Sequence, residues 1–215
     1  MSAEFTILGR GRAGRALAAA LGERVSLQPR DAEPEGAVLL ALPDSALQKY
    51  SAKFKDRCAH LSGSLHIDGV PSLHPLVSFD GDAADWRGMP LAVTGEPSRP
   101  ILDALTSVGF VPFDLPAHLK PLYHACAVLA SGHLATLFAA ATEILKSSGI
   151  ALPGSGLAPL AHTAINNAAK HGRQGITGPF ARGDRETIQR DLNALPEEWR
   201  GVFGGVGNRG LGVRG

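Results

Sequence analysis

The chain has 215 residues, of which 44% are hydrophobic and 19% charged, and its formal net charge is +1. This composition predicts a folded chain of one large or two small domains and argues against a disordered one. The near-zero charge argues against general binding to nucleic acid or to an anionic membrane surface. The two cysteines, Cys58 and Cys126, form no CxxC pair, so we expect neither a disulfide framework nor a cysteine metal site.

The N-terminal residues 1–4 lack the basic start of a signal peptide and lead into a short apolar segment. The longest apolar region, 125–141, is interrupted by Ser131, Gly132 and His133. We interpret this region as a buried helix and not as a membrane span. The sequence therefore predicts a cytoplasmic protein that binds neither membrane nor nucleic acid.

The first half of the chain alternates short apolar runs with helical patterns, which is typical of a parallel sheet covered by helices. Asp44 is expected to cap the second of the helices in this half. Strands are predicted at 5–8, 25–27, 37–42, 57–61, 91–94 and 110–113, and helices at 12–21, 45–55 and 97–107.

The second half has a different pattern, which predicts helices only. From 117 to 148 the only proline is Pro121, in the first turn where a helix tolerates it, so this span predicts one long helix that ends at Gly149. Further helices are predicted at 157–171 and 184–195. We therefore expect a first domain at 1–115, a helical domain at 116–203, and a glycine-rich tail at 204–215 that is disordered.

A glycine-rich motif directly follows the first predicted strand and opens the first predicted helix; it reads Gly9-Arg10-Gly11-Arg12-Ala13-Gly14. In this context the GxGxxG spacing indicates a dinucleotide-binding turn. Gly9 allows the tight turn, Gly11 lets the backbone approach a pyrophosphate, and Gly14 lets the helix pack closely on the strand. The N–H groups at the start of the helix would bind the phosphates. The alternative is an ordinary glycine-rich turn.

The end of the second strand indicates which dinucleotide binds. An NAD site usually has an acid there that accepts from the ribose 2′-hydroxyl, but this strand ends in Gln28-Pro29-Arg30. Arg30 could pair with a 2′-phosphate, and Arg10 or Arg12 could assist it. The pattern favours NADP over NAD. The alternative for Arg30 is a solvated loop residue.

Together with this motif, six later stretches resemble a bacterial family of NADP oxidoreductases in which a Rossmann-like domain precedes a helical domain of unassigned function. That family belongs to the 6-phosphogluconate dehydrogenase-like group, and ketopantoate and pyrroline-5-carboxylate reductases are distant relatives. The resemblance implies NADPH-dependent reduction of a small keto or imino compound. The matching stretches are 41–44, 60–63, 72–76, 122–125, 177–179 and 182–184.

The chain departs from the family pattern in three places. The link between Leu27 and Ala37 is too short for the usual helix and strand, and the segment 64–72 is short for the usual helix. His133 stands where the family more often has asparagine. We therefore expect an α/β fold in which a trimmed Rossmann parallel sheet is joined to an all-helical, 6-phosphogluconate dehydrogenase-like second domain.

The strand ends predict where the cofactor lies, because a Rossmann sheet binds its ligand at the carboxyl ends of its strands. Leu42, Pro43 and Ser62 follow the third and fourth predicted strands and are expected to line the cofactor. Turn and cap chemistry is the alternative for the Ser62 and Pro43 loops.

Three polar residues of the long helix, Lys120, His124 and Ser131, fall on one stripe at about 100° per residue. The Lys120-x-x-x-His124 spacing resembles the Lys-x-x-x-Asn pair of the wider dehydrogenase group. That resemblance implies that Lys120 protonates or stabilises the alkoxide and that His124 orients the substrate or shares the proton. Ser131 would position the substrate. The alternatives are a solvated Lys120, a core His124 and a Ser131 that bonds to its own helix.

Other polar residues of the helical half are weaker substrate-contact candidates. Asn166 and Asn167 lie on the second predicted helix, and Arg182 could grip a substrate carboxylate. Asp184 could simply cap the third helix. His66 and His74 are near no carboxylate cluster, so we expect no metal site.

Three expectations concern the whole protein: its assembly, its substrate and a rival function. A helical half of this size has too little core of its own to cover a long helix, so we expect a homodimer joined through it. The partner in catalysis would be a small molecule that carries a carboxylate. The rival function is a dinucleotide-binding sensor or scaffold without turnover.

Overall fold

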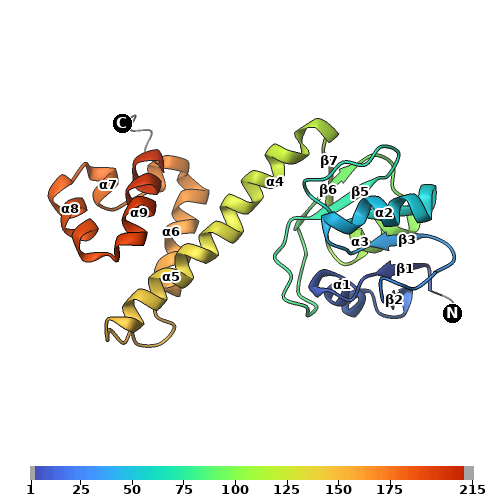
Figure 1. The fold of residues 1–215 in the computed structure, drawn as a ribbon, viewed down its shortest axis with the longest axis horizontal. Helices are drawn as coiled ribbons and strands as arrows, with labels where there is room; N and C mark the ends of the chain where they lie inside the picture. Colours follow the sequence, from blue (N-terminus) through green and yellow to red (C-terminus); the bar gives the residue numbers. More distant parts are fainter. Residues whose placement is uncertain (1–2, 211–215) are drawn as a thin grey trace. The chain divides into compact units, whose positions relative to one another are not determined.

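The computed structural model describes residues 3–210 of the chain, with side chains to 208, as two compact units, Met1–Leu134 and Ala135–Gly215 (Figure 1). The first unit contains a seven-stranded sheet in the order β2-β1-β3-β4-β5-β6-β7. Neighbouring strands are parallel except β5 and β6. The strands are β1 (Phe5–Leu8), β2 (Val25–Gln28), β3 (Val38–Leu40), β4 (Cys58–His60), β5 (Ser72–Pro75), β6 (Pro90–Thr94) and β7 (Val111–Asp114).

Helices cover both faces of this sheet because successive strand residues point to opposite sides. Helices α1 (Arg12–Leu21) and α3 (Arg99–Ser107) pack on the face that contains Ile7. Helix α2 (Asp44–Phe54) packs on the other face, against Leu8 (Figure 1). The predicted α/β class, with a trimmed Rossmann sheet and a helical second part, is confirmed.

The link between β2 and β3 contains no helix, as its length predicts. It is held instead by Arg57, at the end of the short helix η2 (Lys55–Arg57), whose Nη1 donates to the carbonyl oxygens of Pro34 at 2.9 Å and Gly36 at 2.8 Å. Strand β2 is the first strand in the order of the sheet and so forms one of its edges. The turn that follows β2 and contains Arg30 lies at that edge.

Strand β5 was not predicted, because a histidine and a terminal proline replace the usual β-branched residues in its four positions. It is antiparallel to β6 and parallel to β4. Its last residues therefore emerge at the same end of the sheet as the residues that follow β3 and β4. At the far edge, β7 leaves Val111 and Phe113 exposed.

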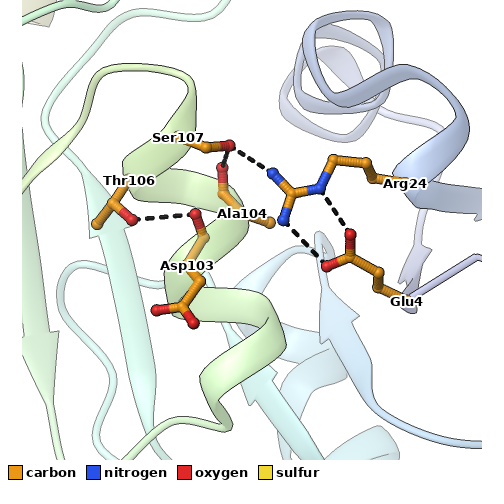
Figure 2. A network of polar contacts seen from close by, with 6 residues as sticks. All are labelled: Glu4, Arg24, Asp103, Ala104, Thr106 and Ser107. Carbon is orange, nitrogen blue, oxygen red and sulfur yellow. Dashed lines mark hydrogen bonds and ion pairs between the residues drawn. The ribbon is translucent and has the colours of Figure 1, made fainter.

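A polar network joins the start of the sheet to the end of α3 (Figure 2). Arg24, in the short helix η1 (Gly22–Arg24), donates to both carboxylate oxygens of Glu4, at 2.7 and 3.0 Å, and to Ser107 Oγ at 2.6 Å. Ser107 Oγ in turn donates to the carbonyl oxygen of Ala104 at 2.7 Å. The network is exposed, so it orients these ends without dominating the stability of the fold.

The predicted long helix is a continuous helical run of four segments. They are η3 (Ala117–Leu119), α4 (Lys120–Val128), the π-helical turn η4 (Leu129–His133) and α5 (Leu134–Ser147). The expected domain boundary lies where β7 ends, after residue 115. The compact units divide after Leu134 instead, because α4 packs on the α/β unit through Lys120.

The remaining helices are α6 (Ala158–His171), η5 (Gly172–Gly175), α7 (Pro179–Arg182), α8 (Arg185–Ala194) and α9 (Glu197–Gly210). Asp184 caps α8, since its Oδ1 accepts from the backbone N–H of Thr187 at 3.1 Å. The prediction of disorder from residue 204 onward is wrong for residues 204–210, because α9 continues to Gly210. Gly207 lies against the Phe180 ring, where a side chain would not fit. Residues 211–215 lie outside the described part of the chain.

The second unit is apolar but hardly buried. Among its side chains that the structure describes, 135–208, only Ala140 is buried. An apolar groove of about 530 Å³ runs between α5, α7 and α9, with Leu137, Ile144, Phe180, Trp199 and Val206 among its lining residues.

Among the described helices, one span, Ala117–Ser147, is long and apolar enough to cross a membrane by length and composition, with a mean hydropathy of 1.5. Only 6% of its most apolar window is buried, so the expectation of a buried helix is wrong within a single chain. The reason is that the helices of the second unit cover only part of its apolar surface. We propose, as the sequence predicts, that a second copy of the chain covers it.

Leu160 of α6 is 67% exposed, so a monomer should tolerate an aspartate there. We expect Leu160→Asp to weaken dimerisation at least tenfold, because a charge would then enter an apolar interface. Light scattering coupled to gel filtration, across a concentration series, measures this. His162→Asp on the same helix is the matched control, as His162 is already polar and exposed. A monomeric unmodified protein at micromolar concentration would contradict the proposal.

Candidate functional site

The glycine-rich turn has the geometry that its sequence predicts. Gly9 has φ 121°, in the region that favours glycine, and a Cβ atom there would collide with the carbonyl oxygen of Ala41. A Cβ atom at Gly14 would collide with the carbonyl oxygen of Gly9. Gly11 is different, because a Cβ atom there would meet nothing within 4 Å. The fold thus needs Gly9 and Gly14, whereas Gly11 faces open space.

The start of α1 offers backbone donors to an anion. Its first helical hydrogen bond runs from Arg15 N to Gly11 O at 3.0 Å. The N–H groups that precede Arg15 in the helix therefore point out of its N-terminus, where the helix dipole favours negative charge. With open space at Gly11, this turn fits the pyrophosphate of a dinucleotide.

A cleft of about 370 Å³ lies at the carboxyl ends of four strands in the first unit. This is the switch point of the sheet, since β1 lies between β2 and β3. The predicted residues Gly11, Arg12, Ala13, Leu42, Pro43, Ser62 and His124 line it, together with Ala41, Asp44, Leu61, Gly63, His74, Pro75, Val77 and Phe79.

Asp44 does not cap α2 with its side chain, although the sequence predicts a cap. Its Oδ2 accepts from the hydroxyl groups of Ser62 and Ser64, both at 2.9 Å. Ser62 Oγ also accepts from the backbone N–H of Leu65 at 2.9 Å. The carboxylate therefore joins the loop after β3 to the loop after β4 and fixes the floor of the cleft.

Lys120 is buried, with 1% of its surface exposed, so it is not a solvated lysine. Its Nζ donates to the carbonyl oxygen of Ser62 at 2.9 Å and to Ser72 Oγ at 2.6 Å. Burial lowers the pKa of its ammonium group to about 8, an effect that the Asp44 carboxylate partly offsets. Lys120 stands behind the Ser62 loop and does not line the cleft.

His124, one turn later on α4, does line the cleft. Its ring lies edge-on to His74, with centroids 6.0 Å apart. His74 Nδ1 is 3.0 Å from the Tyr123 hydroxyl. The sequence did not predict His74 and Tyr123 as site residues: His74 lies on β5, which was not predicted, and for Tyr123 the available signal was its position next to His124.

Ser131 is not part of this cluster. Its hydroxyl donates to the carbonyl oxygen of Ala127 at 2.7 Å, one of the alternatives that the sequence left open. The π-helical turn Leu129–His133 begins between His124 and Ser131, so the regular rotation of 100° per residue no longer applies there.

The other predicted contacts lie apart from the cleft lining. Arg10 and Arg30 are exposed on the turns after β1 and β2, which meet where Gly9 N donates to Gln28 O at 2.9 Å. Asn166, Asn167 and Arg182 are exposed on helices of the second unit. Among the described residues, no group of three or more His, Cys, Asp or Glu side chains could hold a metal ion.

A buried histidine lies beneath the cleft. His60 is fully buried at the end of β4, and its Nδ1 accepts from the backbone N–H of Ser62 at 3.2 Å. Burial and, to a smaller extent, the nearby Lys120 ammonium together lower the pKa of His60 to about 4, against an opposing effect of the Asp44 carboxylate. His60 is therefore neutral at neutral pH and supports the Ser62 loop.

Comparison with known proteins places this chain among proteins of the same architecture. Residues 89–209 match the family model described as "Domain of unknown function (DUF2520)". A structure described as a "putative NADP oxidoreductase" from Bacteroides fragilis is 18% identical, with a TM-score of 0.80 and 97% of each chain covered. Protein TM1727 from Thermotoga maritima is 19% identical, with a TM-score of 0.72 and the same coverage.

A third similar structure is a reductive aminase from Aspergillus terreus in complex with NADPH and ethyl levulinate. It is 17% identical, with a TM-score of 0.54, and the match covers 100% of this chain and 89% of that chain. No curated protein matches the chain. The resemblance stated from the sequence motifs is confirmed by the family match and the shared fold.

The buried His60 makes stability depend on pH. The unfolded histidine binds a proton near pH 6.5 and the folded one only near pH 4, so the unfolded state holds more protons in between. We expect the free energy of unfolding to fall as pH drops from about 6.5 to about 4, on the order of 1 kcal/mol per pH unit from His60.

Urea unfolding at pH 7 and pH 5 measures this effect. His60→Asn keeps an acceptor for the Ser62 N–H and removes one titrating ring, so it should reduce the dependence and leave the part that His74, with a similarly lowered pKa, contributes. The exposed His162→Gln is the control and should leave it unchanged. An unmodified dependence in His60→Asn would show that His60 titrates normally.

Proposed function

The chain belongs to the DUF2520 family, and on that premise we propose that it is an NADPH-dependent reductase of a small keto or imino compound. The observation that carries the proposal is the cleft in which the glycine turn, the strand-end loops and two imidazoles meet. The names of the neighbours, an NADP oxidoreductase and a reductive aminase with bound NADPH, support it. We also propose a cytoplasmic location and, from the resemblance, a ketopantoate-like substrate with a carboxylate.

The residues present fit a dinucleotide. The turn at Gly11 and the start of α1 would hold its pyrophosphate, and Leu42, Pro43 and Ser62 would line its nicotinamide half. Arg30, with Arg10, would bind a 2′-phosphate at the open edge beside β2. When bound, the dinucleotide supplies the hydride.

The remaining residues have distinct tasks in this proposal. His124 contacts the substrate, because its ring reaches the cleft. Lys120 acts as a positioning residue: it holds the Ser62 carbonyl and the Ser72 hydroxyl in place. The buried ammonium also adds positive potential behind the cleft, which favours a substrate oxygen on which negative charge develops.

A dinucleotide-binding sensor without turnover is the second candidate. The observation that favours it is the position of Lys120, whose amine is used within the fold and does not line the cleft. A protein that binds NADPH but oxidises it with no member of a keto- and imino-acid panel would be such a sensor.

Cofactor preference tests the proposal directly. We expect NADPH to bind at least several-fold more tightly than NADH, and Arg30→Asp to erase the difference, because the guanidinium is the exposed partner for a 2′-phosphate. Gly11→Val should abolish binding of both without unfolding the chain, since that position has space for a side chain. Fluorescence titration and circular dichroism measure these effects. Equal affinities in the unmodified protein would refute the NADP assignment.

Variants of two residues of α4, His124 and Lys120, distinguish a residue that contacts the substrate from one that positions other groups. His124→Ala should raise KM about tenfold, the scale of one lost hydrogen bond, and leave NADPH affinity unchanged. Lys120→Met should instead lower the free energy of unfolding by about 1–3 kcal/mol, because it leaves two buried acceptors unpaired.

Ser131→Ala on the same helical run is the matched control and should change neither quantity, since its hydroxyl bonds within the helix. Steady-state kinetics and urea unfolding report the two effects. Full stability in Lys120→Met would contradict the positioning role.

A further inference from the structure

His74 is a histidine to which the sequence assigned no function. It is the third residue of β5 and lines the cleft beside Gly63. A Cβ atom at Gly63 would lie 2.8 Å from His74 Nε2 and 2.9 Å from His124 Cδ2. The glycine thus leaves the room in which Nε2 of His74 sits at the cleft, next to the predicted nicotinamide loop.

The other nitrogen of His74 is held by Tyr123. The phenol oxygen is 3.0 Å from Nδ1, and the two rings meet edge to face with centroids 5.5 Å apart. Phe113 of β7 also lies edge to face with the Tyr123 ring, with centroids 6.1 Å apart. Tyr123 does not line the cleft, so it stands behind His74 as seen from a substrate.

We propose that His74 is the proton donor of the reaction in this cleft, with Tyr123 as the residue that supplies its proton; this rests on the proposed reductase function. In this proposal the Tyr123 hydroxyl is the donor to Nδ1, which puts the ring proton on Nε2, the nitrogen beside Gly63 at the cleft. The arrangement places a donor beside the loops that would hold the nicotinamide.

The proton and electron balance of the step is complete. As the carbonyl carbon accepts the hydride with its two electrons, the carbonyl oxygen takes the proton of His74 Nε2. Nδ1 takes the phenolic proton at the same time, which leaves Tyr123 as a phenolate. A solvent proton then enters at Nε2, and the proton on Nδ1 returns to Tyr123.

The surroundings keep both groups neutral at rest. Burial, with smaller effects of His124 and Lys120, lowers the pKa of His74 to about 4, while the Asp44 carboxylate opposes the shift. Burial also raises the pKa of Tyr123. A neutral imidazole can act as an electrophilic hydrogen-bond donor in an active site.

The tautomer provides a test that needs no activity. In the protein with ¹⁵N-labelled histidine, His74 should be neutral from pH 6 to pH 8, with Nε2 protonated and Nδ1 accepting a hydrogen bond. Tyr123→Phe should shift the Nδ1 resonance because its donor is gone. A protonated Nδ1 in the unmodified protein would overturn the proposal.

Kinetics then separates this proposal from the function on which it rests. His74→Gln and Tyr123→Phe should lower kcat by about 10²-fold or more and leave NADPH affinity unchanged. Both should lose a solvent isotope effect that the unmodified protein shows, which a merely structural role would not produce. Thr142→Val, on α5 in the other unit, is the matched control and should keep the full rate.

The outcomes are distinct. NADPH oxidation by the unmodified protein with full rates in His74→Gln would overturn the proton donor and leave the reductase standing. NADPH binding without oxidation of any keto or imino acid in the panel would overturn both. Gly63→Ala gives a second check, since its methyl group would displace His74 and should mimic the loss.

Discussion

The buried ammonium of Lys120 is the contact on which the candidate site depends. It joins the first turn of α4 to the loop after β4 and the first residue of β5. A lysine is rarely buried so completely. Two hydrogen bonds and the nearby Asp44 carboxylate offset part of the free-energy cost of removing its ammonium group from water. Because Tyr123 and His124 follow three and four residues later on α4, this one anchor also fixes where their side chains lie relative to the cleft.

The rest of the cleft follows from the sheet. Parallel strands bring the glycine turn and the two loops that Asp44 joins to one edge. Strand β5 adds His74 at the same edge. The chemistry of the site is thus assembled from a backbone turn that fits an anion and from the imidazole of His74, which burial keeps neutral.

The sequence predicted the α/β unit well, because hydrophobic period and glycine spacing are local signals. Residues 5–8 and 12–21 have the predicted structure to the residue. The predictions lost accuracy where the outcome depends on long-range contacts. The burial of Lys120 depends on Ser62 and Ser72, which are distant in the chain. Ser131 departs from the helix stripe of Lys120 and His124 because of a π-helical turn, which a rotation of 100° per residue does not describe. His74 was missed because an irregular strand of four residues carries little local signal.

The exposed edge strand β7 has a consequence for solubility. Val111 and Phe113 would make it an attractive template for sheet growth from another molecule. The backbone N–H of Val111 donates to the carbonyl oxygen of Met89, and that of Leu115 donates to the carbonyl oxygen of Val93. The backbone positions of the alternate residues, 112 and 114, therefore face away from the sheet. Pro112 occupies the first outward position and has no N–H to give. A strand that paired with this edge would find no N–H donor at Pro112 and would then lie beside the charged Asp114. The edge therefore resists aggregation, although Val111 and Phe113 are apolar.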